Sequence, residues 1–159
     1  MNVSVSVLED RLSDFIQVVR GLAEAGDLFV GVPEDKAARD SGAINNATLA
    51  AIHNAGSPAQ NIPARPFLTQ GIDKCKKDVT DILAAGARSA LDNLDAEELT
   101  KAQTEAGLTA QNAVKGEFRN GGFEPLKAPR RGREGRKQTS TTPLVDTGSL
   151  RNSIGFVVR

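Results

Sequence analysis

The polar residues that could take part in catalysis are few and widely spaced. His53 is the only histidine of the 159-residue chain, and no cysteine or acidic pattern accompanies it at a spacing typical of metal ligands. A histidine with a structural role at a helix end is therefore the favoured interpretation. Asp146 and Ser149 offer an acid and a hydroxyl, but no base is placed to activate the serine. Asp-Thr-Gly-Ser is also typical of a helix cap.

Two short motifs resemble those of enzymes without meeting their requirements. The Asp-Thr-Gly tripeptide at 146–148 occurs in aspartic proteases, which need two such loops with apolar flanks to build a carboxyl pair that shares a proton. Here the flanks are Pro-Leu-Val and Ser-Leu-Arg. Residues 132–137 resemble a phosphate loop, but their glycines are too close together and no strand precedes them. The sequence therefore predicts no enzymatic activity, no cofactor and no bound metal.

The composition is that of a soluble globular domain. Charged residues make up 25% of the chain and hydrophobic residues 39%, and the length suits a single domain over 1–159. Aromatic residues are only 4%, with no Trp or Tyr, which disfavours a surface that stacks on nucleic-acid bases. Lys and Arg number 20, and so do Asp and Glu. This zero balance argues against polyanion binding by the whole chain and suits a subunit that assembles.

Cysteine usage and hydropathy give expectations about the compartment. Cys75 is the only cysteine, so an intramolecular disulfide is impossible, and its place in an apolar stripe predicts a small buried side chain. The N-terminus lacks the basic start and apolar run of a signal peptide. No stretch reaches the roughly 18 apolar residues of a membrane span. We expect the protein to be made in a reducing cytoplasm, with no membrane partner.

Hydrophobic periodicity predicts an α+β fold, in which a small sheet is packed by an N-terminal helix and by long helices. The predicted elements, in order, are strand 2–7, helix 9–24, strand 27–32, helix 47–55, helix 66–93, helix 95–118 and strand 153–158. Asn45 or Asn46 can cap the helix 47–55, and Asp146 or Thr147 can cap a short helix before the last strand.

A rigid connector joins the short helix 47–55 to the long helix that follows it. Gly56 can take the positive φ that ends a helix, while Pro63 and Pro66 hold the backbone between them extended. Arg65 lies between these prolines, on a backbone that cannot easily re-aim its side chain. We consider two interpretations equally, an ion pair with another subunit and a solvated surface arginine.

Residues 121–143 lack periodicity and predict a flexible loop or arm. Within them, residues 127–137 hold six basic residues and one acidic residue, a net charge of +5 that leaves −5 on the remainder of the chain. The sequence favours the acidic surface of a neighbouring subunit as partner of this arm. DNA in a channel, or no partner at all, stay open as alternatives.

Four segments of the chain, in order, resemble a family of tailed-phage virion proteins. They are Leu-Phe-Val-Gly-Val-Pro at 28–33, the Ala-Ile-His-Asn-Ala-Gly and Ile-Pro-Ala-Arg-Pro-Phe-Leu motifs within 50–72, Phe-Glu-Pro-Leu at 123–126, and Pro-Leu-Val-Asp-Thr-Gly-Ser-Leu-Arg-Asn-Ser-Ile at 143–154. The last is the most specific. The family comprises tail-completion or tail-terminator proteins of the phage neck, similar to the HK97 gene-10-like and Mu-like morphogenesis proteins.

The resemblance implies a structural virion protein of the head–tail junction that completes the tail and joins it to the connector. Members form rings of about six subunits with closed symmetry. The implied partners are further copies of the chain, the tail tube protein and the head–tail connector or adaptor, with DNA passing through the channel. The implied locations are the virion neck and, during assembly, the host cytoplasm. Candidate subunit or neck contacts are Arg65, Phe67, Arg130, Arg131, Arg133, Arg136 and Arg151.

Three other functions stay open at this point. One is a head-completion or adaptor protein of the same neck with another ring size. A second, from a different class, is a small DNA-binding regulator that uses the basic residues 127–137. An enzyme is the least favoured of the three, since no nucleophile and base stand together.

Overall fold

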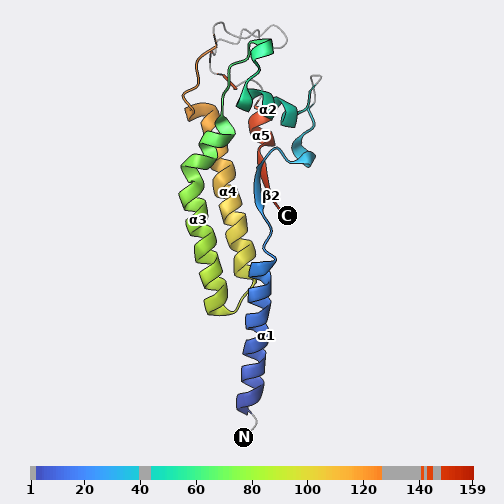
Figure 1. Cartoon of the computed structure of the whole chain (residues 1–159), viewed down its shortest axis with the longest axis vertical. Coiled ribbons are helices and arrows are strands. Elements are labelled where there is room, and N and C mark those ends of the chain that lie inside the picture. The colour runs from blue at the N-terminus through green and yellow to red at the C-terminus, as the bar shows by residue number, and fades with distance from the viewer. Residues whose placement is uncertain (1–2, 40–43, 127–140, 142, 145–147) are drawn as a thin grey trace. The chain divides into compact units, whose positions relative to one another are not determined.

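The computed structural model describes residues 3–39, 44–126, 141, 143–144 and 148–159 of the chain (Figure 1). Its elements, in order, are α1 (Val3–Ala23), β1 (Leu28–Gly31), η1 (Glu34–Lys36), α2 (Asn46–Ala55), η2 (Pro58–Gln60), α3 (Phe67–Asn93), α4 (Glu97–Asn120), α5 (Ser149–Ser153) and β2 (Gly155–Val158). The protein is mostly helical, and β1 and β2 form a small two-stranded antiparallel sheet. The predicted α+β class is confirmed.

The predicted strand at 2–7 is wrong, because α1 already begins at Val3. Alternating valines suit a strand, but a strand needs a neighbour to pair with. Extending the helix formed by 9–24 toward the N-terminus gains one backbone hydrogen bond for each added residue, and it needs no partner strand. The described part of the sheet therefore has two strands where the sequence predicted three.

Contacts divide the chain into two compact units. Unit 1 comprises Met1–Phe29, Cys75–Ala110 and Phe156–Arg159, and unit 2 comprises Val30–Lys74 and Gln111–Gly155. Each unit therefore holds one part of α3 and one part of α4. The expectation of a single domain over 1–159 stays a prediction.

Small residues bring α3 and α4 close together in unit 1. A methyl group added at Gly86 would lie 2.1 Å from Cβ of Ala102, so the two helices touch almost backbone to backbone. The ring of Phe156 from β2 packs over Gly107, where an added Cβ would lie 2.3 Å from a ring carbon. This contact explains a glycine in the middle of α4. Among the described side chains of unit 1, the buried ones are Val18, Cys75, Ala90, Ala102, Ala106 and Ala110.

Unit 2 is organised around a pair of aromatic rings. Phe67, the first residue of α3, and Phe118, near the end of α4, have ring centroids 4.7 Å apart and planes inclined by 57°. Both rings are buried, as is Val114 one turn earlier on α4. Ala50, Leu150 and Ile154 complete the buried core from α2, from α5 and from the residue that follows α5.

Side chains cap the starts of α2 and α4, whereas α5 has none at its cap position. Asn45 Oδ1 accepts a hydrogen bond of 2.8 Å from the Thr48 amide, which confirms it as the cap of α2. Asp95 Oδ1 accepts a bond of 2.9 Å from the Glu97 amide at the start of α4. The cap position of α5 is Gly148, which has no side chain to offer, while Asp146 and Thr147 lie outside the described residues.

Lys74 and Glu117 link α3 to α4 within unit 2. Lys74 Nζ lies 2.6 Å from Glu117 Oε1, and the glutamate side chain is only 5% exposed. Its second oxygen is buried and has no hydrogen-bond partner in the described chain. The positive charge of Lys74 therefore offsets much of the desolvation cost of burying the Glu117 carboxylate.

Replacing Lys74 by Met is expected to destabilise the protein by about 1–2 kcal/mol, because the buried carboxylate loses a charged donor. Urea unfolding measures the change. Lys77→Met is the matched control, since Lys77 pairs with Asp81 at a surface where both side chains are largely exposed. Equal stabilities of the two variants would contradict the structural role of the Lys74–Glu117 pair.

Candidate functional site

The connector between α2 and α3 forms a tight, proline-rich turn in unit 2. Gly56 ends α2 with φ 78°, as expected from the sequence, and an added Cβ there would lie 2.7 Å from the Ala64 amide. Ser57 and Ile62 then form an antiparallel bridge through two backbone hydrogen bonds of 2.8 and 2.9 Å. The loop is therefore closed on itself before the chain reaches Arg65.

The end of α2 also holds the start of α3. The Arg65 amide donates a hydrogen bond of 2.7 Å to the His53 carbonyl. Asn54 Oδ1 accepts a bond of 3.1 Å from the Leu68 amide, one of the free amides of the first turn of α3. These bonds fix the direction in which the Arg65 side chain leaves the backbone.

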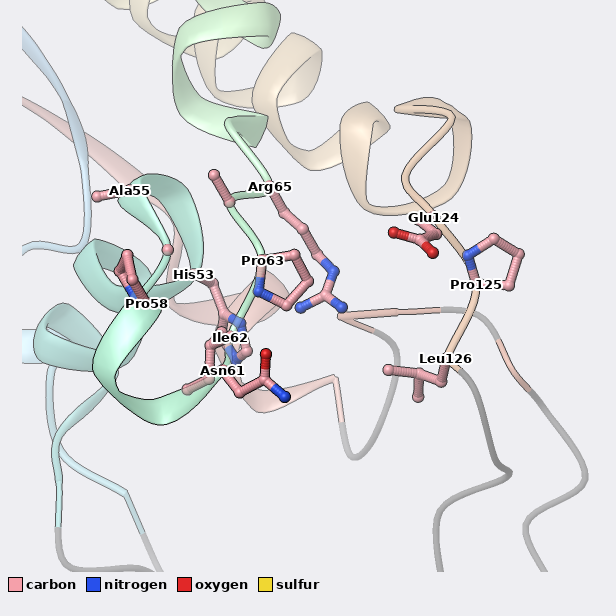
Figure 2. Close-up of a pocket in the computed structure, with 12 residues that line it drawn as sticks. His53, Ala55, Pro58, Asn61, Ile62, Pro63, Arg65, Glu124, Pro125 and Leu126 are labelled. Atoms are coloured by element: carbon pink, nitrogen blue, oxygen red, sulfur yellow. The ribbon is translucent and has the colours of Figure 1, made fainter.

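A cavity of about 720 Å³ opens beside this connector. Figure 2 shows the Arg65 side chain reaching into the space between His53 on one side and Glu124 on the other. The remaining lining residues are Ala55, Gly56, Pro58, Asn61, Ile62, Pro63, Ala64, Pro125 and Leu126. The volume lies in the range of small-molecule and peptide sites.

The charges around the cavity suit recognition better than bond cleavage. Arg65 is only 7% exposed, whereas Glu124 is exposed, so the deep polar group is a cation that stays charged at any physiological pH. Within residues 3–39, 44–126, 141, 143–144 and 148–159, no group of three or more His, Cys, Asp or Glu could hold a metal ion. The absence of catalytic activity stays a prediction.

The structure places three of the seven sequence-predicted contact residues. Arg65 is buried, so its interpretation as a solvated surface arginine is wrong, while an ion pair with another subunit is untested. Phe67 is 0% exposed and belongs to the core of unit 2, because its ring packs on Phe118. The other four residues, Arg130, Arg131, Arg133 and Arg136, lie outside the described residues, as does most of the arm 121–143.

Arg151, the third placed residue, belongs to a group of basic side chains in unit 2. Burial lowers the pKa of Lys115, and the positive charges of Lys36 and Arg151 lower it further. Arg151 Nε is buried and has no hydrogen-bond partner in the described chain. These three side chains form a positively charged patch that would attract an anionic partner.

Replacing Lys115 by Met is expected to raise the melting temperature at pH 7 by on the order of 1–2 °C, since the folded state disfavours this charge. The lowered pKa of Lys115 means that the folded protein binds its proton less tightly. Stability should therefore rise with pH up to about 10.4, the unfolded value, and the advantage of the variant should vanish there.

Calorimetry over this pH range measures the effect. Lys101→Met is the control, because Lys101 pairs with Glu98 at 2.6 Å and its loss should lower stability. A Lys115→Met variant that is less stable than the parent at pH 7 would contradict the electrostatic interpretation.

Asn46 is a structural residue that the sequence identified only as an alternative helix cap. It is 2% exposed, and its Nδ2 lies 3.3–3.4 Å from the Lys36 and Ala38 carbonyls and from Ser149 Oγ. It thereby joins α2 to α5 and to the loop after β1. No helix-cap signal marks this role, because the carbonyl partners lie eight and ten residues earlier and Ser149 lies 103 residues later in the chain.

Comparison of the chain with protein-family models, with curated proteins and with solved structures found no match. Among the helices of the described residues, none is long and apolar enough to cross a membrane.

Proposed function

We propose that this chain is a structural virion protein of a tailed phage, a tail-completion or tail-terminator protein of the head–tail junction. In this role it forms a closed ring of about six subunits, which binds the tail tube on one side and the connector or adaptor on the other. Its work is assembly, so the relevant chemistry is that of interfaces. It acts in the virion neck after assembly in the host cytoplasm.

One observation carries this proposal. The four segments that resemble the phage family lie far apart in the sequence, yet they supply most of the hydrophobic core of unit 2. The core residues from these segments are Val30, Val32, Ala50, Phe67, Leu68, Ile72, Phe123, Leu144, Leu150 and Ile154. Matches that arise by chance have no reason to meet in one core. Their convergence supports a resemblance that reflects a shared fold.

The surface of unit 2 offers features suited to a neck subunit. The cavity beside Arg65 can receive an extended segment of a partner, because prolines and aliphatic side chains line it around a buried cation. The basic patch of Lys36, Lys115 and Arg151 suits an acidic partner surface or the phosphates of DNA in the channel. These features support the proposed partners by their chemistry.

A stop codon at Gln17 in the phage genome that encodes the chain tests the proposed function. We expect DNA-filled heads and separate tails that fail to join, and supplying the intact chain from a plasmid should restore joined particles. A synonymous change at the same codon is the control. Joined, infectious particles produced without the chain would overturn the proposal.

A further inference from the structure

Helix α1 exposes an apolar stripe that nothing in the described part of unit 1 covers. Leu12, Phe15, Ile16 and Val19 are between 43% and 59% exposed and follow the spacing i, i+3, i+4, i+7 of one helical face. Every residue of 11–17 is exposed, and Val18 is the first buried residue among the described side chains of α1. Helices in proteins gain most of their stability by packing such a face, so the stripe of this 21-residue helix is suited to a partner.

We propose that the stripe of α1 packs against the outer face of α3 in a second copy of this chain. That face offers small residues, Ala84 and Ala85, followed by Leu91, which is 38% exposed. Large side chains on one helix and small ones on the other allow close interdigitation. The two surfaces therefore complement each other in size.

The register of the two helices follows from this fit. If the helices run antiparallel with Leu12 opposite Leu91, then Val19 falls opposite Ala84 at the other end of the contact. Leu12 and Val19 are seven residues apart, and so are Ala84 and Leu91. Seven residues make about two helical turns, so the two apolar faces stay aligned along the whole contact.

Charges agree with the same register. Arg11 falls opposite Asp92, and Asp14 falls within one residue of Arg88. All four side chains are exposed, and none belongs to an ion pair within the described chain. A parallel arrangement of the helices would lose both pairings. Charge complementarity of this kind selects a partner and its orientation more than it adds affinity.

The contact is heterologous, because each copy gives α1 to one neighbour and α3 to another. Such contacts close into rings when the rotation between copies allows it. The inference rests on the proposed ring for this closure, but the contact itself can be measured between two copies. The contact involves fewer residues than the roughly 20–30 per side of a standard interface. We therefore expect it to be weak between two copies and to be strengthened when the ring closes.

Disulfide trapping between single-cysteine variants tests the contact even if it is weak. Full-length Leu12→Cys and Leu91→Cys proteins are mixed at equal concentration and oxidised with copper phenanthroline. We expect a covalent dimer in the mixture at a yield at least tenfold above that of either variant alone. Buried Cys75 stays in place, and the parent protein shows its background reaction. Leu12→Cys mixed with Thr104→Cys, an exposed site on α4, is the geometric control.

A charge exchange provides an independent readout. Arg11→Asp placed in the Leu12→Cys protein should reduce the mixed dimer at least tenfold, and Asp92→Arg in the Leu91→Cys protein should restore it. Self-linked Leu12→Cys dimers would show an α1–α1 contact instead, and a mixed yield no higher than the Thr104→Cys control would show none. Either result overturns the proposal, as does a failure of Asp92→Arg to restore the linkage.

This experiment also separates the contact from the proposed function. Copies that cross-link as expected but are missing from purified particles would refute the virion role and leave the α1–α3 contact intact. A chain found at the neck whose cysteine variants do not cross-link, in solution or in the particle, would refute the contact alone.

Discussion

Replacing Phe67 by alanine is expected to lower the free energy of unfolding by about 3–5 kcal/mol. The ring is fully buried, lies 4.7 Å from the ring of Phe118 and fills the space where the first turn of α3 meets α4. Truncation removes the transfer free energy of the ring and leaves a cavity that rigid neighbours cannot close. Val114, also buried, lines the same core and lies on the same helix as Phe118.

Urea unfolding followed by circular dichroism measures this loss. Phe29→Ala is the matched control, because the Phe29 side chain in β1 is 53% exposed and its removal should cost far less. If the two variants lose the same stability, Phe67 is not the centre of the unit 2 core.

Replacing Gly71 by alanine is expected to destabilise the protein, although alanine is the better helix former. An added Cβ would lie 2.6 Å from the Val114 Cα and 2.9 Å from its amide nitrogen, so the backbones of α3 and α4 must move apart. Such overpacking costs about 1–3 kcal/mol, and a backbone neighbour places the cost at the upper end. The gain in helix propensity is only about 1 kcal/mol, so destabilisation wins.

Gly116→Ala in α4 makes the same chemical change without the clash. Outside its own stretch of α4, no atom of the described residues lies within 4 Å of the position its Cβ would take, so this variant should be stabilised by about 0.5–1 kcal/mol. Thermal melts of both variants beside the parent therefore should shift in opposite directions. Two shifts of the same sign would contradict the close approach of α3 and α4.

Local signals in the sequence were sufficient to predict most of the helices. Periodic apolar residues located α3 and α4, Asn45 located the start of α2, and Gly56 located its end, because each acts within a few residues of its own position. The strand at 2–7 was misassigned for the same reason. Its valine alternation is a local signal, whereas the choice between strand and helix depends on whether a neighbouring strand is available.

The site was harder to predict, because it depends on contacts between distant segments. Arg65 looks like a surface residue between two prolines, yet residues far along the chain, such as Glu124 and Leu126, line the same cavity and help to enclose it. Phe67 was expected to reach another subunit, but the ring of Phe118 covers it. Burial of this kind is a tertiary property that residue type and spacing alone do not contain.

A reconstruction of the head–tail junction, in the phage particle that encodes this chain, tests the central proposal most directly. We predict a closed ring at the junction, about six copies around the channel, into whose density unit 2 fits with its Phe67–Phe118 core intact. A complete neck that contains no copy of this chain, or only a single copy, would contradict it.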